Sequence, residues 1–152
     1  MPQKYEIVYF NWVFRINKLK DQFSLKNQND EIFTVNQRIG KPMVIYFYPK
    51  DDTPGCTKQA CRFRDDFESF NDLGALVIGI SADSVASHKK FEEKYNLPFI
   101  LLADTENVVR NLFGVPKNLF LIPGRVTYVI DKNGIVQYVF NSQLNAEKHI
   151  EN

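Results

Sequence analysis

The chain has 152 residues, of which 44% are hydrophobic and 24% are charged, and this composition fits one globular domain with a sizeable core. Its 19 basic and 18 acidic residues leave a net charge of +1, so electrostatics give no reason to expect nucleic acid or an anionic membrane as a partner. No apolar run approaches the roughly 18 residues that would span a bilayer.

Residues 1–20 are expected to form an N-terminal extension, either an added strand or a disordered segment. They lack both the small-residue cleavage site of a signal peptide and the Ser and Arg richness of an organelle transit peptide. Residues 21–152 are expected to form the domain. The 2 cysteines do not staple a secreted fold and favour a reducing compartment, so we expect a cytoplasmic location.

The order of the predicted elements indicates an α/β domain. Two short extended segments within 23–35 flank a polar turn at 27–30, and 43–48 is a strongly apolar, buried strand. A helix follows the next loop and runs to about Asn71. The later pattern predicts strands at 75–80 and 99–102, helices at 84–95 and 105–113, a hairpin of 126–130 with 135–140, and a short last helix from about 145. Strands that alternate with helices and end in a hairpin predict a sheet of mixed direction.

Local signals refine these elements. We expect Ser84 or Asp83 to cap the helix at 84–95, and Gly114 and Pro116 to end the helix at 105–113. Three residues at helical spacing are predicted to be core: Phe63, Phe67 and Phe70.

Both cysteines lie in the stretch 49–61, between the buried strand and the following helix. The order of strand, Pro/Gly loop and helix places Cys56 in the first helical turn, where unpaired backbone N–H groups and the helix dipole favour an anion. A thiol is a weak nucleophile until it ionises, so this position favours a reactive thiolate. The Thr53 hydroxyl can hydrogen-bond the thiolate or an oxygen atom beside it. Pro49 stiffens the loop and can shield the sulfur from water.

Cys61 lies five residues after Cys56. On one unbroken helix their Cα atoms would be roughly 8.5 Å apart, whereas a disulfide needs about 4.4–6.8 Å. The two cysteines can therefore pair only if a turn of the helix opens. In the reduced protein we expect both on one helix, with Cys61 facing inward.

The pattern Pro49-x-x-x-Thr53-x-x-Cys56 resembles the active-site signature of the peroxiredoxins. The longer string from Tyr46 to Cys61 is similar to the bacterioferritin-comigratory, or peroxiredoxin Q, branch of that family. The similarity covers roughly residues 21–150 and continues through Gly79–Asp83, Tyr95–Phe99, Pro123–Asp131 and Asn141–His149.

This resemblance implies a thioredoxin-like fold, with a mixed central sheet flanked by helices, and the activity of a thioredoxin-dependent, atypical two-cysteine peroxidase. It implies that Cys56 reduces hydrogen peroxide or an organic hydroperoxide and that Cys61 then forms an intramolecular disulfide with it. It implies that Arg125 stabilises the thiolate and the peroxide oxygens. It also implies a thioredoxin or similar dithiol protein as the reductant, no bound cofactor, and a monomeric chain.

Other functions remain open from the sequence. The protein can be a thiol–disulfide redox sensor that does not turn over, although such a sensor needs neither Thr53 nor Arg125. It can also be a chaperone-like binding module on the same fold, with incidental thiols. By itself, Arg125 would be a solvated surface charge, Thr53 a helix cap and Cys61 a small buried hydrophobe.

The remaining polar candidates are assigned no chemistry. His88 and His149 are predicted on exposed helical faces, and Asp51 and Asp52 are predicted as loop caps rather than general bases. Clusters of Cys and His with the spacing of metal ligands are absent from the sequence, so no metal is expected.

Overall fold

The computed structural model of the protein describes residues 23–35, 40–115 and 125–141. The strands in these ranges are β1 (Phe23–Asn27), β2 (Ile32–Val35), β3 (Met43–Phe47), β4 (Leu76–Ser81), β5 (Ile100–Ala103), β6 (Val126–Ile130) and β7 (Val136–Asn141). They form one seven-stranded sheet in the order β2-β1-β5-β4-β3-β6-β7. β3, β4 and β5 are parallel and the other neighbours antiparallel, so the predicted mixed sheet is confirmed.

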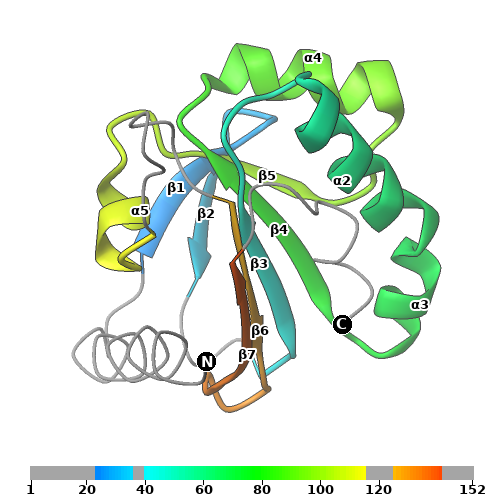
Figure 1. Ribbon diagram of the computed structural model, residues 1–152, viewed down its shortest axis with the longest axis vertical. Coiled ribbons are helices and arrows are strands. Elements are labelled where there is room, and N and C mark those ends of the chain that lie inside the picture. Colours follow the sequence, from blue (N-terminus) through cyan, green and yellow to red (C-terminus); the bar gives the residue numbers. More distant parts are fainter. Residues whose placement is uncertain (1–22, 36–39, 116–124, 142–152) are drawn as a thin grey trace.

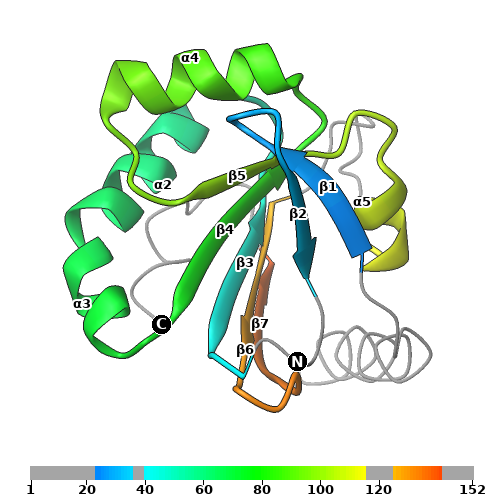
Figure 2. The same cartoon turned by 180° about the vertical axis from the view of Figure 1, so that it is seen from behind.

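Helices cover both faces of this sheet. The described ones are α2 (Pro54–Asp65), α3 (Phe67–Asp72), α4 (Val85–Tyr95) and α5 (Val108–Leu112). Figures 1 and 2 show α2, α3 and α4 on one face and α5 on the other. Strand β3 lies inside this arrangement, and all five of its residues are buried, as the apolar sequence predicts for a central strand with both faces covered.

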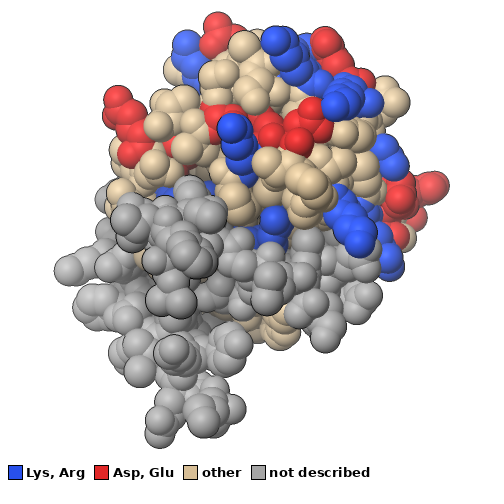
Figure 3. All heavy atoms as spheres, turned by 45° about the horizontal axis from the view of Figure 1, so that its top comes forward, with Lys and Arg blue, Asp and Glu red and all other residues tan. Residues whose placement is uncertain are grey.

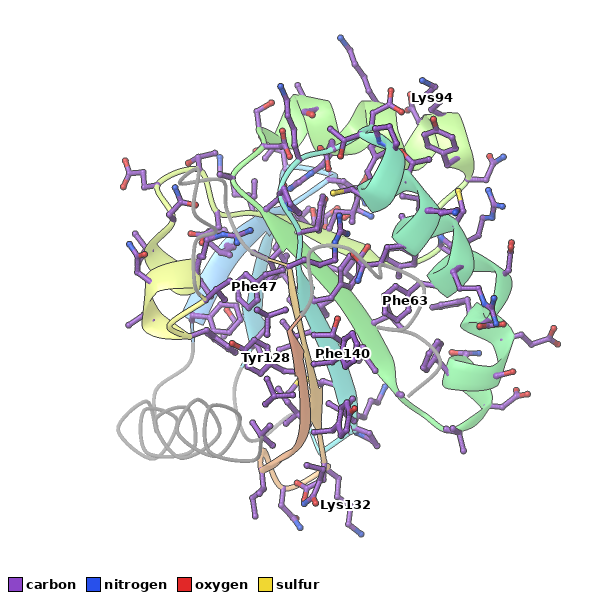
Figure 4. The ribbon with its side chains drawn as sticks, viewed as in Figure 1. Phe47, Phe63, Lys94, Tyr128, Lys132 and Phe140 are labelled. Carbon is purple, nitrogen blue, oxygen red and sulfur yellow. The ribbon has the colours of Figure 1, made fainter. Side chains whose placement is uncertain are left out.

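The two faces hold separate apolar clusters, because successive side chains of a strand point to opposite sides. Tyr46 points toward α2 and stacks on Phe63 with ring centroids 4.7 Å apart. Phe47 points the other way and meets Tyr128 with centroids 5.9 Å apart. Figure 4 shows Phe63 between α2 and the sheet, and Phe47 with Tyr128 on the side of α5.

Several local predictions are confirmed. Ser84 is the N-cap of α4, and its side chain accepts a hydrogen bond of 3.1 Å from the Ser87 backbone N–H. The hairpin of β6 and β7 closes through a turn in which Gly134 has a positive φ of 80°, a conformation that glycine adopts without strain. Of the predicted core phenylalanines, Phe63 is fully buried, while Phe67 and Phe70 pack against the same cluster and are partly buried.

Two predicted helices differ from the structure. The helix expected to run to Asn71 breaks at Asp66, whose φ of −95° and ψ of 3° end α2 and let α3 turn its phenylalanines onto the sheet. The helix expected at 105–113 begins only after Asn107, which is left-handed with a φ of 57°. The Asp104 carboxylate accepts from the backbone N–H groups of Val109 and Arg110 and so ties down the start of α5.

Pro116, the last predicted helix from about 145 and the N-terminal extension 1–20 lie outside the described residues. In the described ranges, every helix is too short or too polar to cross a membrane. Figure 3 shows acidic and basic side chains intermingled over the helices on the face it presents, in keeping with the net charge of +1.

Candidate active site

The start of α2 holds Cys56 as its third residue, as predicted. Strand β3 ends at Phe47, the chain turns through 48–53, and Pro54 takes the first helical position, where its missing N–H costs no hydrogen bond. Cys56 is only 1% exposed, and both cysteines are free thiols. The thiol is thus enclosed at a helix terminus whose first backbone N–H groups have no partner within the helix.

The pairing of β3 with β6 brings Arg125 to this thiol. The antiparallel register sets Phe47 opposite Val126, so the residue before β6 lies beside the end of β3. Arg125 Nη2 lies 3.3 Å from Cys56 Sγ, although 69 positions separate the two residues in the chain. The Arg125 side chain is buried, so little solvent screens its charge from the sulfur. Arg125 was expected either as a cation beside Cys56 or as a solvated surface charge. The structure places it beside Cys56.

Gln59 and Gly55 fix the direction of the Arg125 side chain. Gln59 Oε1 accepts a hydrogen bond of 2.5 Å from Arg125 Nη1, and Gln59 is fully buried. A Cβ atom at Gly55 would lie 3.0 Å from Arg125 Nη2, so the lack of a side chain there lets the guanidinium approach the helix. Gln59 was not predicted, although its spacing of three residues from Cys56 places both on one helical face.

Arg110 is a second buried cation near this loop, and it was not predicted either. Its Nη2 donates to Tyr48 O at 2.8 Å, and its guanidinium carbon lies 5.5 Å from the centre of the Phe47 ring. Burial lowers the pKa of Arg110, while Asp104 first and then other negative groups, among them Cys56, oppose the shift. No sequence signal marks Arg110, because it reaches the site only through the packing of α5 on the sheet.

Thr53 and Pro49 lie in the loop beside the thiol. The Thr53 hydroxyl donates a hydrogen bond of 2.8 Å to Lys50 O and makes no capping bond to α2. Among the described residues, therefore, the Thr53 side chain bonds neither the helix nor the Cys56 thiol, and the expected bond to the sulfur is not present. Since the hydroxyl proton is used on Lys50 O, the oxygen keeps lone pairs that can accept another hydrogen bond. Pro49 is half-buried.

A family model described as the AhpC/TSA family matches residues 16–139 of this sequence. The chain belongs to the AhpC/TSA family. The predicted resemblance to the peroxiredoxins is confirmed by this match, which covers the loop, α2 and Arg125 together.

Relatives within the AhpC/TSA family carry more specific names. "Peroxiredoxin Q, chloroplastic" of Sedum lineare is 57% identical over 130 residues, which are 85% of this chain and 70% of that protein. The protein of the same name from Oryza sativa subsp. japonica is 57% identical over 129 residues, which are 84% of this chain and 59% of that protein. The chain thus spans 59% of the length of the rice relative.

Solved structures agree with this assignment. Peroxidoxin BcpB from Mycobacterium tuberculosis is 34% identical with a TM-score of 0.79, over 86% of this chain and 88% of that one. Peroxiredoxin Q from Xanthomonas campestris is 32% identical with a TM-score of 0.77, over 84% of each chain. The predicted peroxiredoxin Q branch and the thioredoxin-like fold are therefore both confirmed.

The expected cytoplasmic location is wrong. The relatives from rice and Sedum lineare are named chloroplastic, which points to a plastid rather than the cytoplasm. The expectation rested on cysteine usage, and cysteine usage reports the redox state of a compartment without saying which compartment it is.

In this AhpC/TSA protein, Cys61 lies with Cys56 on one unbroken helix, as predicted. Cys61 is partly exposed, whereas Cys56 is buried, so the expected inward orientation of Cys61 stays a prediction. Five residues turn the helix by about 140°, so the two side chains leave the helix in different directions. The helix opening that a disulfide between them would need stays a prediction.

The prediction for His88 is wrong. His88, expected on an exposed face of α4, is fully buried, and Asp51, expected as a loop cap, is 6% exposed. Each is buried with the other as its partner, since His88 Nδ1 lies 2.7 Å from Asp51 Oδ2. Asp52 is exposed, as expected for a loop residue, and His149 lies outside the described residues.

Proposed function

We propose that this chain is a thiol-dependent peroxidase that reduces hydrogen peroxide and organic hydroperoxides. The observation that carries the proposal is the buried Arg125 guanidinium 3.3 Å from the Cys56 sulfur at the start of α2. A cation and a helix terminus at one thiol favour its ionised, nucleophilic form.

In the first step, the Cys56 thiolate attacks one peroxide oxygen as the O–O bond breaks. Cys56 becomes a sulfenic acid, and the other oxygen leaves as water or an alcohol after it takes up a proton. Arg125 donates hydrogen bonds to the oxygens as negative charge develops on them. The free lone pairs of the Thr53 hydroxyl accept a hydrogen bond from the hydroperoxide, and Pro49 shields the sulfur from water.

In the second step, the Cys61 thiol condenses with the sulfenic acid. A Cys56–Cys61 disulfide forms and one water molecule leaves. The cysteines share one intact helix in the reduced protein, so at least one turn of α2 must open first. The partial exposure of Cys61 suits this step, because the resolving thiol is not enclosed in the core.

In the third step, a thioredoxin-type dithiol protein reduces the disulfide by thiol–disulfide exchange and is itself oxidised. An organic hydroperoxide as substrate is supported by similarity to the Xanthomonas campestris bacterioferritin comigratory protein, which is 31% identical and is described as having alkyl peroxide reduction activity. We further propose that the protein acts in a plastid, as the word chloroplastic in the names of its relatives suggests. That it acts as a monomer stays a prediction from the family resemblance.

The rival function, a redox sensor without turnover, explains less of the site. A sensor needs two thiols that can pair, but it needs no buried guanidinium aimed at one of them. The contact between Arg125 and Cys56, fixed by Gln59, therefore favours a peroxidase.

A coupled assay tests the proposal. The reduced protein is mixed with thioredoxin, thioredoxin reductase, NADPH and either hydrogen peroxide or an alkyl hydroperoxide. A peroxidase consumes many equivalents of NADPH per protein, and a sensor consumes about one. If neither peroxide oxidises the reduced protein even once, the proposed function is wrong.

A further inference from the structure

A buried cluster of hydrogen bonds joins the loop before Cys56 to α4. Asp51 Oδ1 accepts from Tyr48 Oη at 2.5 Å, while Asp51 Oδ2 accepts from Ser87 Oγ at 2.8 Å and lies 2.7 Å from His88 Nδ1. The Asp51 backbone N–H donates to Asp83 Oδ2 at 2.8 Å. Tyr48, Asp51 and His88 are buried, so water competes little for these bonds.

Both ring nitrogens of His88 have a hydrogen-bond partner. His88 Nε2 is 3.0 Å from Leu102 O, and a carbonyl only accepts, so Nε2 carries a proton. His88 Nδ1 and Asp51 Oδ2 lie 2.7 Å apart, a separation typical of a strong hydrogen bond. Burial first, and then Asp51, raise the pKa of Tyr48 well above its usual value, so the Tyr48 hydroxyl keeps its proton and donates it.

The cluster acts on the part of the chain that carries the reactive thiol. Asp51 precedes Thr53 by two residues and Cys56 by five. The loop 49–53 is short and continues directly into α2, so a shift of Asp51 moves Thr53 and the first helical turn with it. α4 packs beside the sheet and gives this anchor a rigid support (Figure 1).

We propose that His88 is a positioning residue for the reaction of Cys56 with peroxide. Through Nδ1 it holds Asp51, and with it the loop 49–53, so that the Cys56 thiol stays against Arg125. His88 acts through Asp51 and not on the reacting atoms. The proposal rests on the proposed peroxidase function, because the effect of His88 is measured on the oxidation of Cys56.

The same atoms also have a spacing that suits a metal ion, since one ligand atom each from Asp51, Asp83 and His88 lies within 4.8 Å of the others. Protein groups already use them. Asp83 Oδ2 accepts from Ser81 Oγ at 2.6 Å as well as from the Asp51 N–H, and both Asp51 oxygens have hydroxyl donors. We therefore assign the cluster to supporting the loop 49–53 rather than to binding a metal ion.

Two substitutions of His88 separate its two contacts. His88→Asn keeps an amide donor near the place of Nδ1 and loses the bond to Leu102 O. His88→Gln keeps a donor near the place of Nε2 and loses the contact with Asp51. Each variant removes one buried hydrogen bond, so we expect similar losses in melting temperature. The readout is the rate of Cys56 oxidation by hydrogen peroxide in a single turnover, with the sulfenic acid trapped and identified by mass spectrometry.

We expect His88→Gln to slow Cys56 oxidation about tenfold and His88→Asn to slow it by no more than about threefold, since small misplacements of reacting groups cost up to about a hundredfold. Rescue by Asn but not by Gln separates positioning from general destabilisation. Folded His88→Gln protein that reacts at the wild-type rate overturns the proposal, and so does an Asn variant as slow as the Gln variant.

If the His88 variants do not fold, a second pair of substitutions, each of which removes only a hydroxyl group, tests the proposal. Tyr48→Phe removes one hydroxyl donor of Asp51, whereas Tyr46→Phe removes a buried hydroxyl that none of the described residues bonds. We expect Tyr48→Phe to slow Cys56 oxidation about threefold and Tyr46→Phe to leave it unchanged. Equal rates in the two variants refute the proposal. Wild-type protein that does not react with peroxide refutes the proposed function instead, so the two failures are distinguishable.

Discussion

The loop before Cys56 is held by hydrogen bonds to α4, whereas the helix after it covers buried polar atoms that have no partner among the described residues. The loop is bound at two consecutive residues. Asp51 joins the buried cluster with His88, and Asp52 accepts from Lys94 Nζ and Tyr95 Oη, each at 2.7 Å. Both residues are thereby tied to α4.

Beneath α2, fewer of the buried polar atoms are hydrogen-bonded than in the loop. Among the described residues, Tyr46 Oη, Gln59 Nε2 and Arg125 Nε are buried without a hydrogen-bond partner. An unsatisfied buried polar group costs about 1–3 kcal/mol, and opening the helix to water would recover part of that free energy. This difference in hydrogen bonding between the loop and the helix suits the proposed reaction. The loop stays fixed while peroxide reacts, and the helix then unwinds, which requires a segment of low local stability.

Substitution of each cysteine should have a different outcome. Cys56→Ser should abolish peroxide reduction, because no other nucleophile lies against Arg125 in the described structure. Cys61→Ser should still reduce one equivalent of peroxide but lose thioredoxin-dependent turnover. The coupled assay measures turnover, and mass spectrometry measures the single oxidation. Turnover near wild type in the Cys56 variant would contradict the assignment.

The next effect is that of the buried cation. Arg125→Met should slow Cys56 oxidation about a hundredfold, as expected for removal of a donor that acts on developing negative charge. Arg62→Met is the matched control, since Arg62 bonds Asp66 at 3.1 Å on the exposed side of α2. Stopped-flow rates at several peroxide concentrations give the comparison. Equal slowing in both variants would mean that general charge, rather than the Cys56 contact, is what matters.

Amide hydrogen exchange compares the loop and the helix directly. In the reduced protein, amides in 55–61 should exchange at least about tenfold faster than the Asp51 amide, which donates to Asp83. In the disulfide form, the change in protection should be confined mainly to residues near 53–63. Identical protection of both forms, with the disulfide confirmed by mass, would rule out local unfolding as the step between them.

Tyr46→Phe should strengthen the packing under α2. It removes a buried hydroxyl without a described partner, so we expect the free energy of unfolding to rise by about 1 kcal/mol. If opening of α2 exposes this hydroxyl, disulfide formation should slow about fivefold, the factor that 1 kcal/mol gives. Urea titration and a quenched disulfide assay measure the two effects, and Tyr48→Phe, which breaks a bond, should lower the stability instead. A loss of stability in both variants would contradict the claim that the Tyr46 hydroxyl lacks a hydrogen bond while the Tyr48 hydroxyl has one.

The smallest effect is a pH dependence at the exposed end of the loop. Hydrogen bonds from Lys94 first and then from Tyr95 lower the pKa of Asp52. A carboxyl group with a lowered pKa stabilises the fold above its ordinary pKa of about 3.9, and this contribution is lost as the pH falls through the lowered value. The gap in melting temperature between wild type and Asp52→Asn should therefore be present at neutral pH and close as the pH falls below about 3.9 and through the lowered pKa of Asp52. A gap that stays constant down to the lowest pH would show that the charge of Asp52 contributes nothing.

Local sequence patterns were sufficient to place Cys56. An apolar strand, a Pro/Gly loop and a helix are local patterns, and local patterns suffice to set a thiol at a helix start. The spacing of Cys61 likewise determined that the cysteines share a helix without reaching each other. Arg125 was predicted only through the family resemblance, since its own surroundings in the sequence mark it as a surface residue.

Contacts between elements that are distant in the chain became known only from the folded structure. The pairing of β3 with β6 sets Arg125 against Cys56, and the packing of α4 on the loop buries His88 with Asp51. A sequence pattern assigns polar side chains to the surface because burying one alone is costly. That cost is offset when a second polar group from another element is its partner, and only the folded chain brings the two together.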